Sequence, residues 1–305
     1  MRIGVIGTGA MGANHLRVLS RTPGFELTCA VDVSAASLER NAAPYGVALL
    51  ADPRQALPLV DAVAVAAPTQ EHHALCRLFL ENGKHVLVEK PISRTLEEAD
   101  DLIALAAAQG RLLAVGHLER FNPAVEFAAQ RVEKPLFIEV QRLGSFSPRS
   151  LDIDVIMDLM IHDLDIILQW DRSGVREIRA SGVPIISSRI DIANVRLQFH
   201  SGLVANVTAS RVSQEKTRKL RLFQRSLYLS LDYQSRRVKM FQLRDGRIVE
   251  ELPRIEDIEP LANLWRHFGR AAAGQGGRIV SGGDARAALE LAQAIVAALR
   301  PPGDA

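Results

Sequence analysis

The chain opens with the apolar run Ile3-Gly4-Val5-Ile6, followed at once by Gly7-Thr8-Gly9-Ala10-Met11-Gly12. The run predicts a short buried strand, and the residues after the glycines, about Ala13–Ser20, have the pattern of a helix. Glycines at such a junction permit a tight turn and a close approach of the backbone to a pyrophosphate, which the helix N-terminus favours electrostatically. A tight structural turn without a ligand is the alternative, but the strand before and the helix after favour a dinucleotide-binding loop.

Asp32 ends the next predicted strand, 20 residues beyond Gly12. A carboxylate at this place accepts hydrogen bonds from ribose hydroxyls and repels a 2′-phosphate, so the sequence predicts NAD rather than NADP as the cofactor. Asp32 also has the residue type of a helix N-cap, and the sequence leaves this alternative open.

Short apolar runs alternate with helical segments over the first 120 residues, which predicts a doubly wound parallel sheet with helices on both faces. The predicted strands are Ile3–Ile6, Glu26–Val31, Val47–Leu50, Val63–Ala67, Val86–Val88 and Leu112–Val115. Later strands come close together, with turns at Ser201-Gly202 and Asp245-Gly246, which predicts a mainly antiparallel sheet. We therefore expect an α/β fold with a cofactor domain over residues 1–120 and an α+β substrate domain over residues 121–305.

A lysine follows the predicted strand in Gly83-Lys84-His85-Val86-Leu87-Val88-Glu89-Lys90-Pro91. Ligands bind at the carboxyl ends of the strands of an open parallel sheet, and a lysine there is partly desolvated and readily shifted in pKa. Lys90 is therefore a functional candidate by position, and Pro91 restricts the backbone after it.

The segment Ala67-Pro68-Thr69-Gln70-Glu71-His72 ends a neighbouring strand and begins a helix, so we expect its backbone to border the nicotinamide ribose. We interpret His72 as a helix-start residue or a cofactor contact rather than a catalyst. The residues predicted to bind the cofactor are Gly7, Thr8, Gly9, Ala10, Met11, Gly12, Asp32, Pro68, Thr69, His72, Glu89 and Lys90.

A helix predicted over about residues 154–170 carries a polar face formed by Asp154, Asp158, His162, Asp165 and Gln169. Asp158 and His162 are four residues apart, and a carboxylate beside an imidazole raises its basicity for the abstraction of a hydroxyl proton. Two alternatives are a solvated stripe and a metal site, but no cysteine or second nearby histidine supplies another good metal ligand, so we expect no metal.

The substrate side is expected to begin in Gly116-His117-Leu118-Glu119-Arg120-Phe121-Asn122-Pro123, at the junction of the two domains. Arg120 and Asn122 are candidates for binding substrate oxygens, although Glu119 and Arg120 are equally compatible with a surface ion pair. Arg149 and Arg211 are candidate phosphate ligands, with surface solvation as the alternative.

Composition excludes several classes of protein. The 305 residues exceed what one core usually serves, and 48% hydrophobic with 24% charged residues is typical of a globular protein. The net charge of +2 comes without a dense basic run, so we expect neither nucleic-acid nor membrane partners. With no signal-peptide pattern, no long apolar run and two cysteines in apolar segments, the sequence predicts a cytoplasmic protein with reduced thiols.

Four segments together resemble the Gfo/Idh/MocA oxidoreductases over nearly the whole chain: Gly7–Gly12, Gly83–Pro91, His117–Pro123 and Asp158–His162. The resemblance implies a Rossmann domain followed by a domain with an open sheet that commonly mediates oligomerisation, here as a homodimer or homotetramer. It also implies that Lys90 and His162 serve substrate binding and acid/base catalysis with help from Asp158, and that the Lys90–Pro91 peptide bond is cis. Many members carry glycine where Met160 stands, so close helix contacts there are expected to differ.

Within this family, Val115–Pro123 and Met157–Asp165 are most similar to the UDP-N-acetylglucosamine 3-dehydrogenases. That similarity implies oxidation of the sugar 3-hydroxyl to a ketone, which a partner aminotransferase aminates for lipid A or another surface glycan. The residues then expected to bind the nucleotide sugar are Lys90, Arg120, Asn122, Arg149, Asp158 and His162. A dehydrogenase of a free sugar or inositol is the nearest alternative, and an NAD-binding regulator without turnover is the alternative from another class.

Overall fold

The computed structural model describes residues 1–146 and 153–299. The chain forms two compact units, one of residues 1–118 with 259–286 and one of residues 119–258 with the chain from 287 onward. The assignment of a cofactor domain to residues 1–120 and a substrate domain to residues 121–305 stays a prediction.

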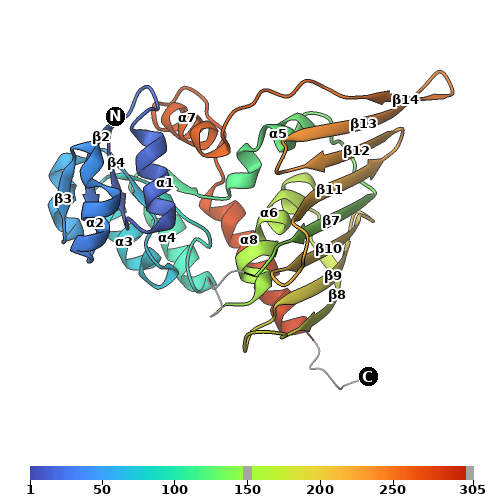
Figure 1. Cartoon of the computed structure of the whole chain (residues 1–305), viewed down its shortest axis with the longest axis horizontal. Helices are drawn as coiled ribbons and strands as arrows, with labels where there is room; N and C mark the ends of the chain where they lie inside the picture. Colours follow the sequence, from blue (N-terminus) through green and yellow to red (C-terminus); the bar gives the residue numbers. More distant parts are fainter. Residues whose placement is uncertain (147–152, 300–305) are drawn as a thin grey trace. The chain divides into compact units, whose positions relative to one another are not determined.

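The first unit contains a parallel sheet of six strands in the order β3-β2-β1-β4-β5-β6 (Figure 1). The strands are β1 (Arg2–Ile6), β2 (Glu26–Val31), β3 (Ala48–Leu50), β4 (Ala62–Val65), β5 (His85–Val88) and β6 (Leu113–Val115). The helices between them are α1 (Ala10–Leu19), α2 (Ala35–Asn41), α3 (Thr69–Glu81) and α4 (Leu96–Ala108). This order reverses between β1 and β4, which is where doubly wound sheets bind their ligands. The predicted fold class is confirmed.

Local sequence explains where these helices begin. Ser34 accepts a hydrogen bond from the Ser37 amide at the start of α2, and Thr95 accepts one from the Glu98 amide at the start of α4. The Thr95–Glu98 contact is the first half of a capping box. Glu98 itself accepts a hydrogen bond from the Arg94 amide at 3.1 Å, so it holds the residue before the cap.

A later part of the chain returns to the first unit, which the sequence did not indicate. Helix α7 (Pro260–Ala272) buries Trp265 and Phe268 completely, or nearly so. The Trp265 ring packs edge-on against Phe25 and against His15 of α1, with centroids 5.5 Å apart in each pair. This aromatic cluster fixes α7 to the rest of the first unit.

The second unit is built on an eight-stranded sheet in the order β14-β13-β12-β11-β7-β10-β9-β8. The strands are β7 (Phe137–Leu143), β8 (Val175–Val183), β9 (Ile192–Phe199), β10 (Val204–Ser210), β11 (Thr217–Gln224), β12 (Leu227–Asp232), β13 (Arg237–Arg244) and β14 (Arg247–Glu251). All neighbours are antiparallel except β7 and β10, which confirms the mainly antiparallel prediction.

One face of this sheet forms the core of the second unit. Buried and more exposed residues alternate along β9, β10 and β12, as expected for strands with one face on the core. The helices α5 (Pro123–Ala129), α6 (Ile161–Trp170) and α8 (Gly282–Ala298) lie on that face (Figure 1). In the described residues, no helix is long and apolar enough to cross a bilayer.

The helix predicted over residues 154–170 has a different geometry at its start. Residues Ile156–Met160 form a π-helical turn, and only Ile161–Trp170 are α-helical. A π turn has more residues per turn than an α-helix, so Asp158 and His162 do not have the angular relation that a regular helix predicts. Such turns occur frequently at functional sites.

Candidate active site

In the glycine loop at the carboxyl end of β1, one glycine has space for a side chain and two do not. Gly7 has φ of +89° and lies against the backbone of residues 66 and 67, so a side chain there would be strained and would clash. A Cβ on Gly12 would lie 1.9 Å from the Gly7 carbonyl oxygen. By contrast, a Cβ on Gly9 would meet none of the described atoms within 4 Å. The loop therefore needs Gly7 and Gly12 for its own structure, whereas Gly9 leaves space beside the loop.

Gly9 is also the N-cap of α1 and provides no side-chain cap. The first amides of α1 are therefore not satisfied by a capping side chain, and the positive end of the helix dipole lies beside the space next to Gly9. Ala10 and Met11, the first residues of the helix, are exposed. This arrangement is suited to a negatively charged group.

Asp32 is tied to the same loop. Its Oδ2 accepts hydrogen bonds from the Thr8 amide at 2.7 Å and the Thr8 hydroxyl at 2.9 Å, and its Oδ1 accepts one from the Ser34 amide at 2.8 Å. Burial alone would raise the pKa of Asp32, but these donors lower it below its ordinary value. Ser34, not Asp32, caps α2, which removes the alternative role for the carboxylate.

Pro68 and Thr69 occupy the first positions of α3, directly after the carboxyl end of β4. His72, on the next turn, is buried, with Nδ1 2.9 Å from the Pro91 carbonyl oxygen and Nε2 2.9 Å from the Ala67 carbonyl oxygen. Burial lowers its pKa. The imidazole therefore links the end of β4 to the loop after β5, and both of its nitrogens contact the protein backbone.

Lys90 and Glu89 follow β5 at the same edge of the sheet. The Lys90–Pro91 peptide bond is cis, as the family resemblance implies, and Lys90 is half-buried. The Glu89 carboxylate lies 2.8 Å from Nε2 of His15, and that histidine accepts a hydrogen bond from the Trp265 indole at 3.1 Å. The sequence did not indicate His15 or Trp265, because their partners lie 74 and 250 residues away along the chain.

In the second unit, Asp158 lies in the π turn and His162 in the first turn of α6, both half-buried. Two other acids on this helix are fully buried, and each holds an arginine. Asp165 accepts two hydrogen bonds from Arg120 at 2.6 and 2.7 Å, and Asp163 accepts two from Arg142 at 2.6 and 2.8 Å. The interpretation of the polar face as a solvated stripe is therefore wrong for Asp165.

Arg120 and Asn122 have protein partners where the sequence analysis expected substrate oxygens. Arg120 is largely buried against Asp165 rather than paired with Glu119 on the surface. Asn122 caps α5 by accepting from the Ala124 amide, and its amide nitrogen donates to the Tyr233 carbonyl oxygen at 3.0 Å. These contacts give both side chains a structural role.

Arg211 is also committed to the protein, since it donates to Asp191 at 2.8 Å and to the Ile153 carbonyl oxygen at 2.7 Å. Arg149 lies outside the described residues. Three other residues predicted to bind substrate are half-buried: Lys90 directly after β5, Asp158 in the π turn and His162 in the first turn of α6.

Comparison with known proteins decides the family. Residues 1–117 match the family described as "Oxidoreductase family, NAD-binding Rossmann fold", GFO_IDH_MocA. A UDP-N-acetylglucosamine 3-dehydrogenase of Acidithiobacillus ferrooxidans is 38% identical over 264 residues, which cover 84% of this chain and 82% of the relative. The chain belongs to the Gfo/Idh/MocA oxidoreductases.

The fold agrees with that of this relative over almost the whole chain. The crystal structure of the A. ferrooxidans enzyme has a TM-score of 0.92, with 34% identity and coverage of 98% of this chain and 97% of that one. Another member of the family, the scyllo-inositol 2-dehydrogenase (NAD(+)) of Bacillus subtilis, is 28% identical and covers 70% of this chain and 68% of its own length.

This oxidoreductase is NAD-dependent by family, and its own residues fit that cofactor. The open position at Gly9 beside the start of α1 fits a negatively charged group such as a pyrophosphate, and Asp32, bonded to Thr8 of the same loop, is of the residue type that accepts from ribose hydroxyls and repels a 2′-phosphate. In the described residues, no group of three or more His, Cys, Asp or Glu side chains is arranged to hold a metal ion.

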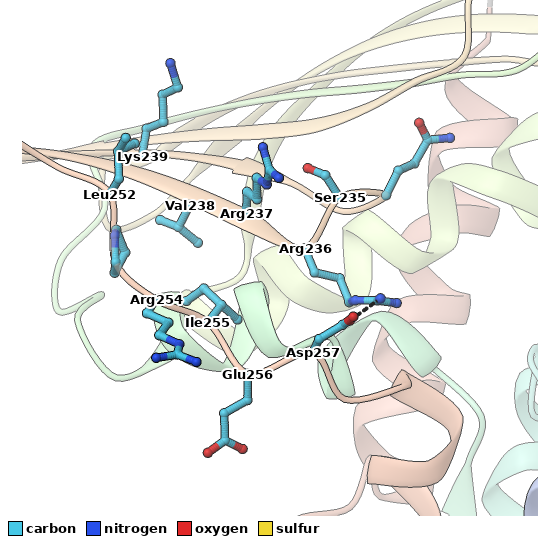
Figure 2. Close-up of a pocket in the computed structure, with 12 residues that line it drawn as sticks. Ser235, Arg236, Arg237, Val238, Lys239, Leu252, Arg254, Ile255, Glu256 and Asp257 are labelled. Atoms are coloured by element: carbon cyan, nitrogen blue, oxygen red, sulfur yellow. Dashed lines mark hydrogen bonds and ion pairs between the residues drawn. The ribbon is translucent and has the colours of Figure 1, made fainter.

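A cavity of about 850 Å³ lies elsewhere in this oxidoreductase, in the second unit (Figure 2). It is lined by residues 234–239 and 252–257, which include the apolar side chains of Val238 and Ile255. Arg236 pairs with Asp257 at one side of it. None of the residues predicted to bind cofactor or substrate lines this cavity.

Proposed function

We propose that this protein oxidises the 3-hydroxyl group of UDP-N-acetylglucosamine to a ketone, with NAD as the oxidant. The observation that carries the proposal is the similarity to a UDP-N-acetylglucosamine 3-dehydrogenase along almost the whole chain, in both sequence and fold. The inositol dehydrogenase relative matches a smaller part of the chain at a lower identity.

Three side chains are assigned to the reaction. His162 takes the proton of the substrate hydroxyl, and Asp158, in the π turn directly before α6, assists it. Lys90, at the carboxyl end of β5, donates a hydrogen bond to the same oxygen and stabilises the negative charge that develops on it. NAD, when bound, supplies the redox chemistry as the hydride acceptor.

The test is hydride transfer. Purified protein with UDP-N-acetylglucosamine and NAD is expected to generate the absorbance of reduced nicotinamide, and myo-inositol or free sugars are expected to generate much less. Turnover of inositol in preference to the nucleotide sugar would select the polyol dehydrogenase. NAD binding with no turnover across a broad sugar panel would select the regulator.

Matched variants separate site residues from neighbours of the same type. Lys90→Ala is expected to lower kcat by about a hundredfold or more, whereas Lys84→Ala, at the opposite end of β5, keeps it. His162→Asn is expected to lower kcat by about a hundredfold to ten thousandfold, whereas His200→Asn, at an exposed position in the same unit, keeps it. Full turnover of Lys90→Ala would remove the role given to this lysine.

We also propose that the protein is a homodimer or homotetramer that uses the open face of its eight-stranded sheet. Support comes from a row of aromatic rings across four strands: Phe137, Phe223, Tyr228 and Phe241, with successive centroids 5.8, 4.6 and 5.4 Å apart. Phe223 in this row is 37% exposed in the single chain. Light scattering that gives the mass of one chain at micromolar concentration would refute this assembly.

The proposed product, a 3-keto sugar nucleotide, is a suitable substrate for an aminotransferase that builds an amino sugar for lipid A or another surface glycan. We place this step in the cytoplasm. A coupled assay with a 3-keto-sugar aminotransferase and an amino donor is expected to pull the oxidation forward, because the ketone is removed. No increase in extent with an aminotransferase shown to be active would count against this pathway position.

A further inference from the structure

Glu89 precedes Lys90 and contacts the buried His15, which in turn is bonded to the buried Trp265; the proposed reaction uses neither of these two residues. The Nε2 atom of His15 lies 2.8 Å from Oε1 of Glu89, and the Nε1 atom of Trp265 lies 3.1 Å from Nδ1 of the same histidine. His15 and Trp265 are fully buried, whereas the Glu89 side chain is 13% exposed. The three side chains come from α1, α7 and the end of β5 in the first unit.

The direction of each hydrogen bond follows from the chemistry of the indole. Its N–H can only donate, so Nδ1 of His15 must accept and cannot carry a proton. The ring proton of a neutral His15 is therefore on Nε2, and this N–H donates to the Glu89 carboxylate. If both ring nitrogens carried a proton, the Nδ1–H group would point at the indole N–H, and two donors would face each other. The carboxylate can only accept and so requires a proton on Nε2, and the indole N–H excludes a second proton on Nδ1.

Gly116 restricts the same carboxylate from another side. A Cβ at this position would lie 2.9 Å from Oε1 and 3.0 Å from Oε2 of Glu89, so a side chain here would displace the carboxylate from its present place. The Gly116 amide donates to the Val88 carbonyl oxygen at 2.8 Å, which fixes this backbone against the end of β5. The Glu89 carboxylate is thus bonded by an imidazole and packed against a backbone, one residue before Lys90.

We propose that His15 and Trp265 are positioning residues that fix the Glu89 carboxylate for contact with the nicotinamide half of NAD. The inference rests on the proposed NAD-dependent function and on the prediction from the sequence that Glu89 binds the cofactor at the carboxyl edge of the sheet. A fixed carboxylate favours the oxidised nicotinamide, which is positively charged, over the neutral reduced form. Helix α7 returns to the first unit to supply the indole that completes this arrangement.

The first measurement is the tautomer of His15, read from the ¹⁵N shifts of its ring in labelled protein at neutral pH. The chain has eight histidines, and the His15→Gln variant identifies the signal. We expect protonated Nε2 and unprotonated Nδ1 in the parent protein. Trp265→Phe keeps an aromatic ring but removes the donor, so it is expected to lose this single-tautomer signature. A proton on Nδ1 in the parent protein would overturn the inference.

The second measurement is the affinity for NAD⁺ and for NADH by calorimetry. His15→Phe removes the donor to a charged group, so we expect NAD⁺ binding to weaken about tenfold to a hundredfold and NADH binding to weaken less. His15→Gln is expected to stay within about threefold of the parent, because its amide nitrogen reaches the place of Nε2 and can still donate to Glu89. Phe268→Leu, on the same face of α7 without a bond to His15, is the packing control and keeps the parent affinity ratio.

The outcomes separate the two proposals. Parent protein that binds no NAD refutes the proposed function, whatever the tautomer. Parent protein that binds NAD, with a folded His15→Phe that binds both forms equally well, refutes the positioning role alone. If His15→Phe does not fold, Trp265→Phe decides: unchanged ring shifts and an unchanged NAD⁺ to NADH affinity ratio overturn the inference.

Discussion

Replacement of Arg142 by methionine is a direct test of the buried ion pair beside the proposed catalytic helix. Arg142 lies on β7 and Asp163 on α6, with side chains 3% and 0% exposed. Methionine fills the place of the arginine stem but leaves the Asp163 carboxylate buried without its partner. Breaking a buried pair from one side costs about 3–5 kcal/mol. For a domain of this size that corresponds to a fall in the unfolding midpoint of the second unit of about 6–20 °C.

The control is an ion pair of the same length at the surface of the same sheet. Arg221 lies 2.6 Å from Glu139, but these side chains are 34% and 35% exposed. Arg221→Met is therefore expected to cost less than about 1 kcal/mol. The double variant Arg142→Met with Asp163→Leu removes both buried charges and is expected to recover most of the lost stability.

The assay is urea unfolding followed by circular dichroism, with the slope of each transition compared as a check on two-state behaviour. Arg142 also donates to Glu119 at 3.0 Å, but that carboxylate is 15% exposed and can be rehydrated. Loss of this contact therefore adds little to the cost. An Arg142→Met variant that unfolds within about 1 kcal/mol of Arg221→Met would refute the reasoning from burial.

Three further predictions need only single variants or one reagent. Gly12→Ala puts a Cβ 1.9 Å from a carbonyl oxygen, so it should lower the free energy of unfolding by about 1–3 kcal/mol or more. Gly9→Ala should melt at the temperature of the parent protein and lose affinity for NAD. Equal melting temperatures for the two variants would contradict the loop geometry. Burial would raise the pKa of Asp191, but the amides of residues 185–187 hold it far lower. The ionised Asp191 carboxylate therefore stabilises the fold fully above about pH 4, and this stabilisation declines as the pH falls towards the pKa of the folded state. The free energy of unfolding of Asp191→Asn should thus fall less with acid than that of the parent protein. An equal dependence on pH in the two proteins would contradict this. Burial raises the pKa of the Cys29 and Cys76 thiols, so neither should react with a thiol reagent before unfolding, and fast reaction of the native protein would show that these sites are open.

The local sequence pattern was sufficient to predict the strands and helices and the position of Lys90. It was insufficient to predict hydrogen-bond partners that lie far apart in the sequence. Strand and helix periods depend on neighbouring residues, so β1 to β6 could be predicted with their order of alternation. Asn122 followed by Pro123 is a common start of a helix, and this local signal was available to indicate a cap. Arg120 gave no such signal, because its partner is 45 residues away.

The polar face of residues 154–170 shows what decides between a structural and a chemical role for an acid on a helix. Periodicity groups Asp158, His162 and Asp165 on one face, but it cannot tell which carboxylates will meet an arginine from another element. Asp165, and Asp163, which the sequence analysis did not single out, each accept two hydrogen bonds from one guanidinium group. These charged hydrogen bonds offset the free-energy cost of burying the carboxylates. Both pairs fix the first turns of α6 to the core, and they leave Asp158 and His162 half-buried on the turn where the helix changes from π to α geometry. The two arginine pairs therefore fix this helix within the second unit, and the burial and the partner of each acid, rather than its place on the helix face, show which carboxylates are structural.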